Sequence, residues 1–179
     1  VPDGAVDYAL DLTDVDVTSV ADADVAPDAD GATCPGWYDP TSGLCWQDPP
    51  PSTAMDLSEA EAYCDVLSLG GYGSWHLPTI DELRSLIREC PATEPGGACA
   101  VTEPWCLDRD FCMNDWCDGC SSMWGCYWPH ALSGPCSVFR SSSVGGDRFG
   151  TCNFVVRFTN ASVECGTSSV HVRCVRPGP

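Results

Sequence analysis

The chain of 179 residues is long enough for one folded domain with a short extension. It carries 26 acidic residues against eight basic ones, all of them arginine, and its net charge is −18. This charge repels nucleic acid and anionic membrane surfaces, whereas cationic partners and divalent cations are favoured. The absence of lysine excludes Schiff-base chemistry by the chain's own side chains.

The 14 cysteines are the second unusual feature of the composition. Such a density indicates metal sites in a reducing cytosol but disulfides in an exported protein. Only Cys117 and Cys120 have Cys-x-x-Cys spacing, and no histidine lies near them, so a metal–thiolate site is the weaker alternative. We expect seven disulfides and an extracellular or cell-surface location. Since no signal peptide or membrane-spanning run is present, we expect an export signal before Val1 and no membrane insertion.

Residues 1–33 form an acidic extension with nine Asp, no basic residue and no cysteine. A disordered spacer is the first interpretation of this composition. One segment also alternates strand-forming residues with Asp and Thr, with one slip of register, which is typical of a β-strand. That strand would pair with an edge of its own domain or with a neighbouring copy of the chain. The candidate assembly residues on this strand are Tyr8, Leu10, Leu12, Val15 and Val17.

A folded domain is expected over residues 34–179, and it begins with a β-hairpin. Turn-forming residues 39–43 separate two short apolar flanks within residues 34–47. Cys34 and Cys45 would lie across the two strands, where they could form a disulfide.

Two helices follow the hairpin, and each begins at a capping box. The first is predicted to start at Asp56, with Glu59 three residues further on, and to end at the glycine pair 70–71. The second is predicted to start at Thr79, with Glu82 three residues further on. The apolar stripes are Leu57, Ala60, Cys64 and Leu67 on the first helix and Leu83, Leu86, Ile87 and Cys90 on the second.

A long insertion rich in cysteine is expected at about residues 91–136, because helical and strand periodicity are both lost there. Eight of the 14 cysteines fall between Cys90 and Cys136. Five side chains with hard oxygen atoms lie close together in this loop, and calcium is bound by such clusters. The alternative interpretation is a solvated acidic loop that disulfides hold in shape. The candidate calcium ligands are Asp108, Asp110, Asn114, Asp115 and Asp118.

The last forty residues or so return to strand patterns. Strands are predicted over residues 137–140, 153–158 and 170–176. Turns are predicted at Gly145-Gly146 and at Asn160-Ala161, between these strands.

The order of several short motifs resembles the Lcl C-terminal domain family. GLCWQ at 43–47, AYC at 62–64, WHLPT at 75–79 and VRCVR at 172–176 follow one another as they do in this family, over residues 37 to 176. The family includes the end of a bacterial collagen-like adhesin and many exported bacterial proteins. The resemblance implies an α+β, C-type-lectin-like fold, in which two helices flank a small, mostly antiparallel sheet.

The resemblance also implies two disulfides. One joins Cys64 on the first helix to Cys174 in the last strand, and the other joins Cys152 to Cys165. The remaining cysteines expected in disulfides are Cys90 and Cys99 and, with their pairing left open, Cys106, Cys112, Cys117, Cys120, Cys126 and Cys136.

Little in the sequence points to catalysis. His76, His130 and His171 are far apart in the chain and have no carboxylate at a local catalytic spacing. The serines at 141–143 lack the context of a nucleophile elbow. We therefore expect a protein that is not an enzyme.

Two non-catalytic functions fit the chain. The first is a structural subunit of a self-assembling extracellular fibre, whose acidic extension docks on the next copy. The alternative is an adhesion module that binds carbohydrate or protein through the long loop region, but not the sulfated polysaccharide that the adhesin binds through a basic surface. Tryptophans in the insertion are expected to form a small loop core, and exposed ones would mark a binding surface. These tryptophans are Trp105, Trp116, Trp124 and Trp128.

Overall fold

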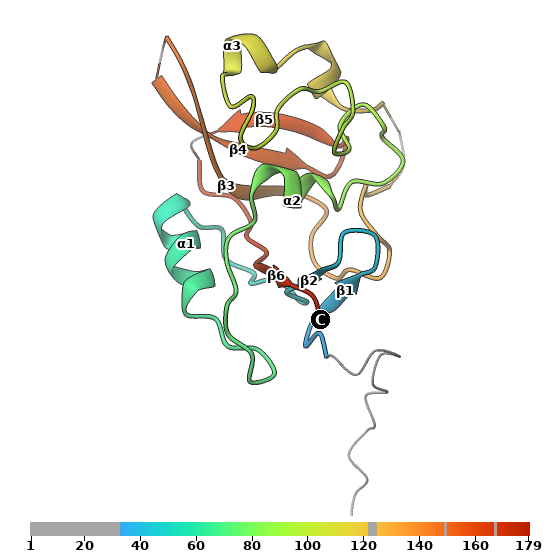
Figure 1. Ribbon diagram of the computed structural model, residues 1–179, viewed down its shortest axis with the longest axis vertical. Coiled ribbons are helices and arrows are strands. Elements are labelled where there is room, and N and C mark those ends of the chain that lie inside the picture. The colour runs from blue at the N-terminus through green and yellow to red at the C-terminus, as the bar shows by residue number, and fades with distance from the viewer. Residues whose placement is uncertain (1–32, 122–124, 149, 167) are drawn as a thin grey trace, which may run out of the picture.

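The computed structural model describes residues 33–121, 125–148, 150–166 and 168–179, and it has an α+β fold (Figure 1). The sequence predicts one small sheet, but the strands of the described residues form two antiparallel sheets, ordered β1-β2-β6 and β3-β4-β5. The strands are β1 (Trp37–Asp39), β2 (Leu44–Trp46), β3 (Val138–Asp147), β4 (Gly150–Arg157), β5 (Ser162–Gly166) and β6 (Val175–Pro177). The helices are α1 (Leu57–Asp65), α2 (Ile80–Arg84), α3 (Arg109–Cys112) and the 3-10 helix η1 (Asp115–Asp118).

Both predicted helices begin at their capping boxes, which confirms these two starts. The Asp56 side chain accepts the Glu59 main-chain N–H, and the Thr79 side chain accepts that of Glu82. Both helices are shorter than their apolar stripes, because the chain continues in tight turns. Leu86 and Ile87 therefore reach the core from a turn that follows α2 rather than from the helix itself. None of the helices in the described part of the chain has the length and apolar character that crossing a membrane requires.

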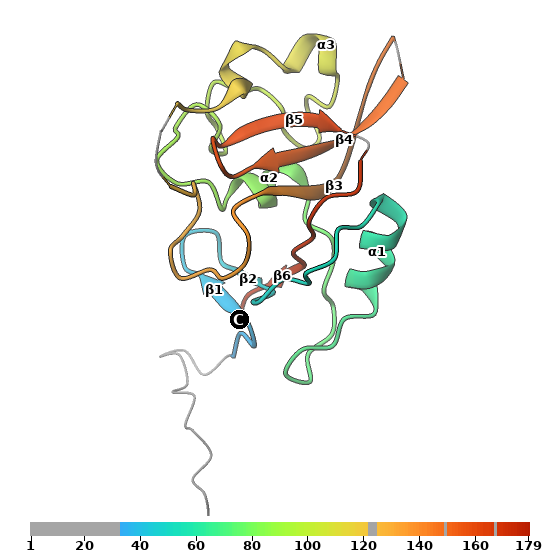
Figure 2. The same cartoon turned by 180° about the vertical axis from the view of Figure 1, so that it is seen from behind.

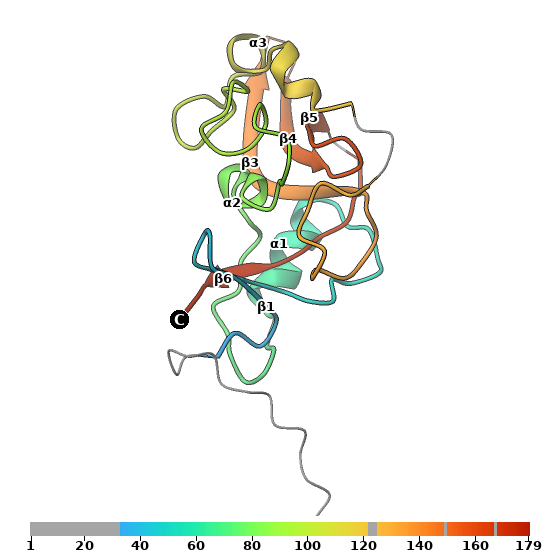
Figure 3. The same cartoon turned by 90° about the vertical axis from the view of Figure 1, so that its right-hand side faces the viewer.

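The first sheet holds the beginning and the end of the described chain side by side. β1 and β2 form the predicted hairpin, and β6 pairs with the other edge of β2. The hydroxyls of Thr33 and Tyr72 are hydrogen-bonded, and the Arg176 guanidinium lies 4.6 Å from the centroid of the Tyr72 ring. Both ends of the described chain therefore lie at one pole of the molecule, and α3 lies at the opposite pole (Figures 1 and 3).

The structure differs from the prediction at one turn, in the second sheet, and in the last strand, which belongs to the first sheet. Gly145 and Gly146 lie inside β3, and not in a turn, because the chain reverses only after Asp147. Gly145 is needed for close packing instead, since a Cβ atom there would lie 2.4 Å from the Phe154 ring. In the predicted strand 170–176, only β6 at its end is a strand, and the preceding residues make isolated bridges.

The main core packs α2 against the second sheet and contains a group of aromatic rings. Trp128, Phe139 and Phe158 have centroids 5.2 to 5.8 Å apart. The Arg173 guanidinium lies 5.0 Å from the Trp128 centroid and donates a hydrogen bond to the Gln47 carbonyl at 2.7 Å. A smaller core surrounds α1 and consists of Cys45, Ala60, Cys64, Trp75, Leu77, Val172 and Cys174.

Candidate functional site

Four disulfides shape the insertion. They join Cys90 to Cys120, Cys99 to Cys117, Cys106 to Cys112 and Cys126 to Cys136. Cys90 and Cys99 thus take their partners from the six cysteines whose pairing the sequence leaves open. The three disulfides outside the insertion join Cys34 to Cys45, Cys64 to Cys174 and Cys152 to Cys165. All seven lie in described residues, which contain no free thiol.

Arg84 of α2 holds the first part of the insertion from inside. Its side chain is 1 % exposed, and the nearest carboxylate is that of Asp81, at 3.9 Å. Burial lowers the pKa of Arg84, and the charge of Asp81 opposes this shift. The guanidinium donates to four main-chain carbonyls, those of Thr93, Glu94, Cys99 and Val101. A buried arginine therefore holds this part of the loop through its carbonyls, beside the buried apolar side chains of Cys99 and Val101.

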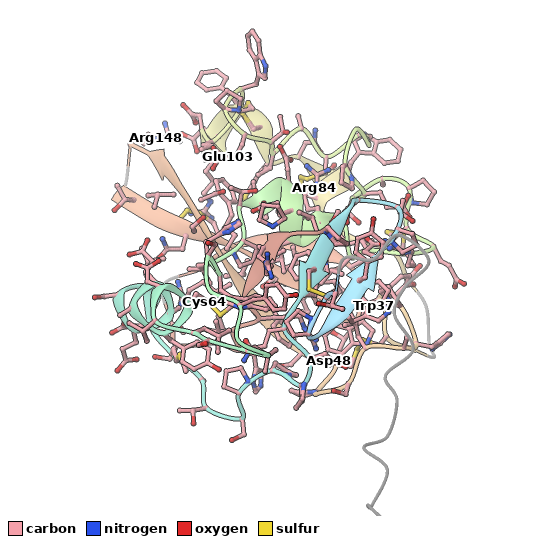
Figure 4. All side chains as sticks on the ribbon, turned by 60° about the horizontal axis from the view of Figure 1, so that its bottom comes forward. Trp37, Asp48, Cys64, Arg84, Glu103 and Arg148 are labelled. Atoms are coloured by element: carbon pink, nitrogen blue, oxygen red, sulfur yellow. A yellow bond between two sulfur atoms is a disulfide. The ribbon has the colours of Figure 1, made fainter. Side chains whose placement is uncertain are left out.

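A second set of contacts ties the middle of the insertion to α2 and β3. The Thr102 hydroxyl donates to the Asp81 carboxylate at 2.6 Å, and the Glu103 N–H donates to it at 3.0 Å. The Ser143 hydroxyl donates to Glu103 at 2.6 Å and accepts the Ile80 N–H at 2.8 Å. Figure 4 shows Arg84, Glu103 and Arg148 along the same end of the molecule.

The insertion also contacts the second sheet in two places, at β3 and at the turn between β4 and β5 (Figure 2). On the β3 side, the Gly146 N–H donates to the Leu107 carbonyl at 3.1 Å. At the turn between β4 and β5, the Cys120 N–H donates to the Asn160 carbonyl at 2.7 Å. Gly119 has a positive φ of 85°, and a Cβ atom there would lie 2.1 Å from the Asn160 oxygen, so this approach requires glycine.

Three aromatic side chains of this rigid insertion are exposed. Trp105 is 87 %, Phe111 85 % and Trp116 62 % exposed, and we call these three residues the aromatic surface. The expected loop core is wrong for Trp105 and Trp116, and Trp124 lies outside the described residues. Trp128, at 6 % exposure, is in the core as expected.

The disulfides fix the positions of this aromatic surface. Trp105 and Phe111 each precede one half of the Cys106–Cys112 disulfide, whose Cα atoms are 5.6 Å apart. Trp116 precedes Cys117, which is buried and bonded to Cys99. Exposed aromatic side chains on disulfide-linked loops lose little conformational entropy on binding.

The five candidate calcium ligands do not form one ligand set. The Asp108 side chain caps α3 by accepting the Asp110 N–H at 2.9 Å, and the Asn114 side chain caps η1 by accepting the Trp116 N–H at 3.0 Å. Among the described residues, no three His, Cys, Asp or Glu side chains lie in a group that could hold a metal ion. All five candidates, Asp108, Asp110, Asn114, Asp115 and Asp118, are exposed.

The histidines lie in three different places. His76 Nε2 lies 3.1 Å from Glu82, His130 is exposed, and the His171 ring lies 5.6 Å from that of Phe139. The hydrogen bond to Glu82 raises the pKa of His76, although burial opposes this shift. Glu82 also accepts hydrogen bonds from the Thr79 N–H and hydroxyl, so the His76–Glu82 pair stabilises the start of α2. The predicted assembly residues Tyr8, Leu10, Leu12, Val15 and Val17 lie outside the described residues.

An α+β scaffold with seven disulfides and a protruding loop region defines the class of this protein as a small disulfide-rich domain. Residues 37–176 match the Lcl C-terminal domain, and the chain belongs to this family. No curated protein and no solved structure matches the chain.

Proposed function

We propose that this chain is a non-catalytic extracellular binding module that contacts its partner through the aromatic surface. The observation that carries this proposal is the exposure of Trp105 and Phe111, each next to one half of the same disulfide. Large aromatic side chains at the surface are favoured where they become buried against a partner. Seven disulfides support an extracellular location for this function.

The scaffold that we propose for this module is C-type-lectin-like. The order of helices, long loop region and final strands supports this assignment, as does the Cys64–Cys174 disulfide between α1 and the segment that leads into β6. In this arrangement the long loop region is the part that varies and binds, while the sheets and helices support it.

The test is a binding screen of the whole chain and of a Trp105→Ala/Phe111→Ala variant against immobilised neutral and sulfated glycans and extracellular-matrix proteins. We expect the variant to lose at least about tenfold in affinity for any ligand that the natural chain binds, because such anchors contribute about 2 kcal/mol or more. Val66→Ala is the matched control, since Val66 is 81 % exposed at the end of α1, far along the chain from the insertion. Ligand binding that is equal in all three proteins contradicts the proposal.

A self-assembling fibre is the second candidate function, and β5 is the observation that favours it. This strand forms one edge of the second sheet, and Glu164, Cys165 and Gly166 on it are partly exposed. Edge strands have unpaired main-chain groups that can accept a strand from another copy. Charge opposes this pairing, because residues 1–33 contain nine Asp, and residues 34–179 carry 17 acidic residues against eight Arg, a net −9.

Deletion of residues 1–26 tests the fibre. If the extension docks on the next copy, electron microscopy and light scattering should show fibres or oligomers of the whole chain but not of the deleted one. High salt should favour assembly, because it screens the repulsion between acidic copies. Fibres that persist after the deletion would rule out docking of the extension.

A further inference from the structure

A shallow hollow of about 530 Å³ lies beside the aromatic surface, between α3 and the β3–β4 hairpin. Phe111, Asp108 and Asp110 line it from the α3 side. Gly146, Arg148, Gly150 and Thr151 line it from the hairpin side. The hollow therefore combines an exposed aromatic ring with two carboxylates at the pole that carries α3.

Two carboxylates and one guanidinium line the hollow, and the insertion as a whole is acidic. Residues 91–136 contain six acidic residues and one arginine, Arg109, which gives the insertion a net charge of −5. Sulfated or phosphorylated ligands are repelled by such a surface, and neutral ones gain nothing from its charge. An ammonium or guanidinium group gains from the carboxylates and from the faces of the aromatic rings.

The protein already places one guanidinium in this hollow. Arg148 Nε lies 3.7 Å from Asp110 Oδ2, and the Arg148 side chain is 76 % exposed. A pair as exposed as this one contributes little to stability. Arg148 shows which chemistry the carboxylates of this hollow accept, that of a guanidinium.

We propose that the aromatic surface and this hollow together bind a basic segment of a partner protein, with a Lys or Arg side chain placed between Phe111 and Asp110. The inference rests on the proposed function and names its partner by charge complementarity. A polypeptide fits better than a small cation, because Trp105 and Phe111 precede the two halves of one disulfide and together offer more aromatic contact area than a small cation can cover.

The experiment measures binding of the whole chain to alternating Arg-Gly, Lys-Gly, Ser-Gly and Glu-Gly peptides of equal length by fluorescence anisotropy. We expect binding of the Arg-Gly and Lys-Gly peptides only, and weaker binding at high salt. Trp105→Ala/Phe111→Ala should weaken this binding about tenfold although it leaves the charge unchanged. Asp108→Asn/Asp110→Asn should weaken it about three- to tenfold, and asparagine retains the α3 cap.

The matched control for charge is Glu61→Gln/Asp65→Asn, which removes two carboxylates from the exposed face of α1. If it weakens peptide binding as much as Asp108→Asn/Asp110→Asn does, binding follows overall charge and the inference is wrong. The inference is also wrong if Trp105→Ala/Phe111→Ala binds the basic peptides as tightly as the natural chain. If the natural chain binds a neutral glycan through Trp105 and ignores the basic peptides, this inference falls while the proposed function stands. If no ligand depends on Trp105 or Phe111, both fall.

Discussion

Three arginines are buried in this domain, and each binds main-chain carbonyls. Arg84, Arg140 and Arg173 are at most 1 % exposed, and main-chain carbonyls accept hydrogen bonds from each of them. A guanidinium has five N–H donors in a fixed plane, whereas an ammonium has three around a point charge. This difference accounts physically for the use of arginine, rather than lysine, at these buried positions.

Arg84→Met is predicted to destabilise the fold by about 3–5 kcal/mol, because four main-chain carbonyls, three of them in buried hydrogen bonds, would lose their donor. Arg84→Lys should recover only part of this loss, since an ammonium cannot reach four acceptors. Urea unfolding followed by circular dichroism measures both effects. Arg148→Met is the control, because its side chain is 76 % exposed, and it should change stability by less than about 1 kcal/mol.

Local features of the sequence predict some residues well and others not at all. The N-caps Asp56 and Thr79 follow from a spacing of three residues to a glutamate, which is a purely local rule. The burial of Arg84 depends on carbonyls nine to seventeen residues away in a loop without periodicity, so no local pattern indicates it. The exposure of Trp105 is not predictable from the sequence either, because composition alone favours a tryptophan in a loop core.

At the scale of elements, hydrogen bonds join the first turn of α2 to the residues that precede the helix and, through His76, to the first sheet. Glu82 accepts hydrogen bonds from the Thr79 N–H and from His76, and His76 bridges to Val175 of β6 through two main-chain hydrogen bonds of 2.8 and 2.9 Å. Burial alone would raise the pKa of Glu82, but the hydrogen bonds from His76 and Thr79 outweigh it and lower this pKa. The start of α2 and the first sheet are thus joined by a titratable pair.

This pair predicts a pH dependence of stability. The pKa of His76 is raised in the folded state, so its contribution is full below its ordinary value of 6.5 and is lost as the pH rises through the folded value. The pKa of Glu82 is lowered, so its contribution is present above its ordinary value of 4.5 and is lost as the pH falls through the folded value. The His76–Glu82 pair therefore stabilises the folded state most between the ordinary pKa values of Glu82 and His76, 4.5 and 6.5.

His76→Gln should lower the urea midpoint more at pH 6 than at pH 8, because the charged interaction of His76 weakens as the pH rises through its raised pKa. His130→Gln is the control, since His130 is exposed, and it should leave the difference between the two pH values unchanged. An equal loss at both pH values would show that His76 acts through packing alone.

The strands show which features a local sequence pattern can predict and which it cannot. The hairpin of β1 and β2 follows from turn residues between apolar flanks. The glycine pair in β3 carries the same signal as a turn, but Gly145 is there because Phe154 of the neighbouring strand leaves no room for a Cβ atom. A contact between two strands therefore requires glycine at this position, and no local sequence pattern indicates that contact.

At the scale of the whole molecule, the disulfides divide into one long crosslink and several short ones. Cys64–Cys174 closes 110 residues, whereas Cys106–Cys112 closes six. In the chain-entropy model the longer loop stabilises more, because it restricts the unfolded chain more. The short crosslink has a local effect and holds Trp105 and Phe111 in place.

Cys64→Ala/Cys174→Ala should therefore cost about 4–5 kcal/mol of unfolding free energy, and Cys106→Ala/Cys112→Ala about 2 kcal/mol. Guanidinium chloride unfolding measures both values. Hydrogen exchange should locate the effect of the second variant in residues 105–112, with ligand affinity reduced although the fold persists. Equal costs for the two variants would contradict the entropic account.

Both ends of the described chain lie at the pole opposite α3, so a tether at either of these ends fixes which side of the domain faces outward (Figures 1 and 3). A tether joined at either end leaves from the β1–β6 side and points the aromatic surface outward. Surface immobilisation through a tag at either end of the described chain should thus leave the aromatic surface free, while a tag inserted beside α3 should block it. The module can serve as the tip of a longer chain or as a bead within one, and in both cases the same side faces the partner.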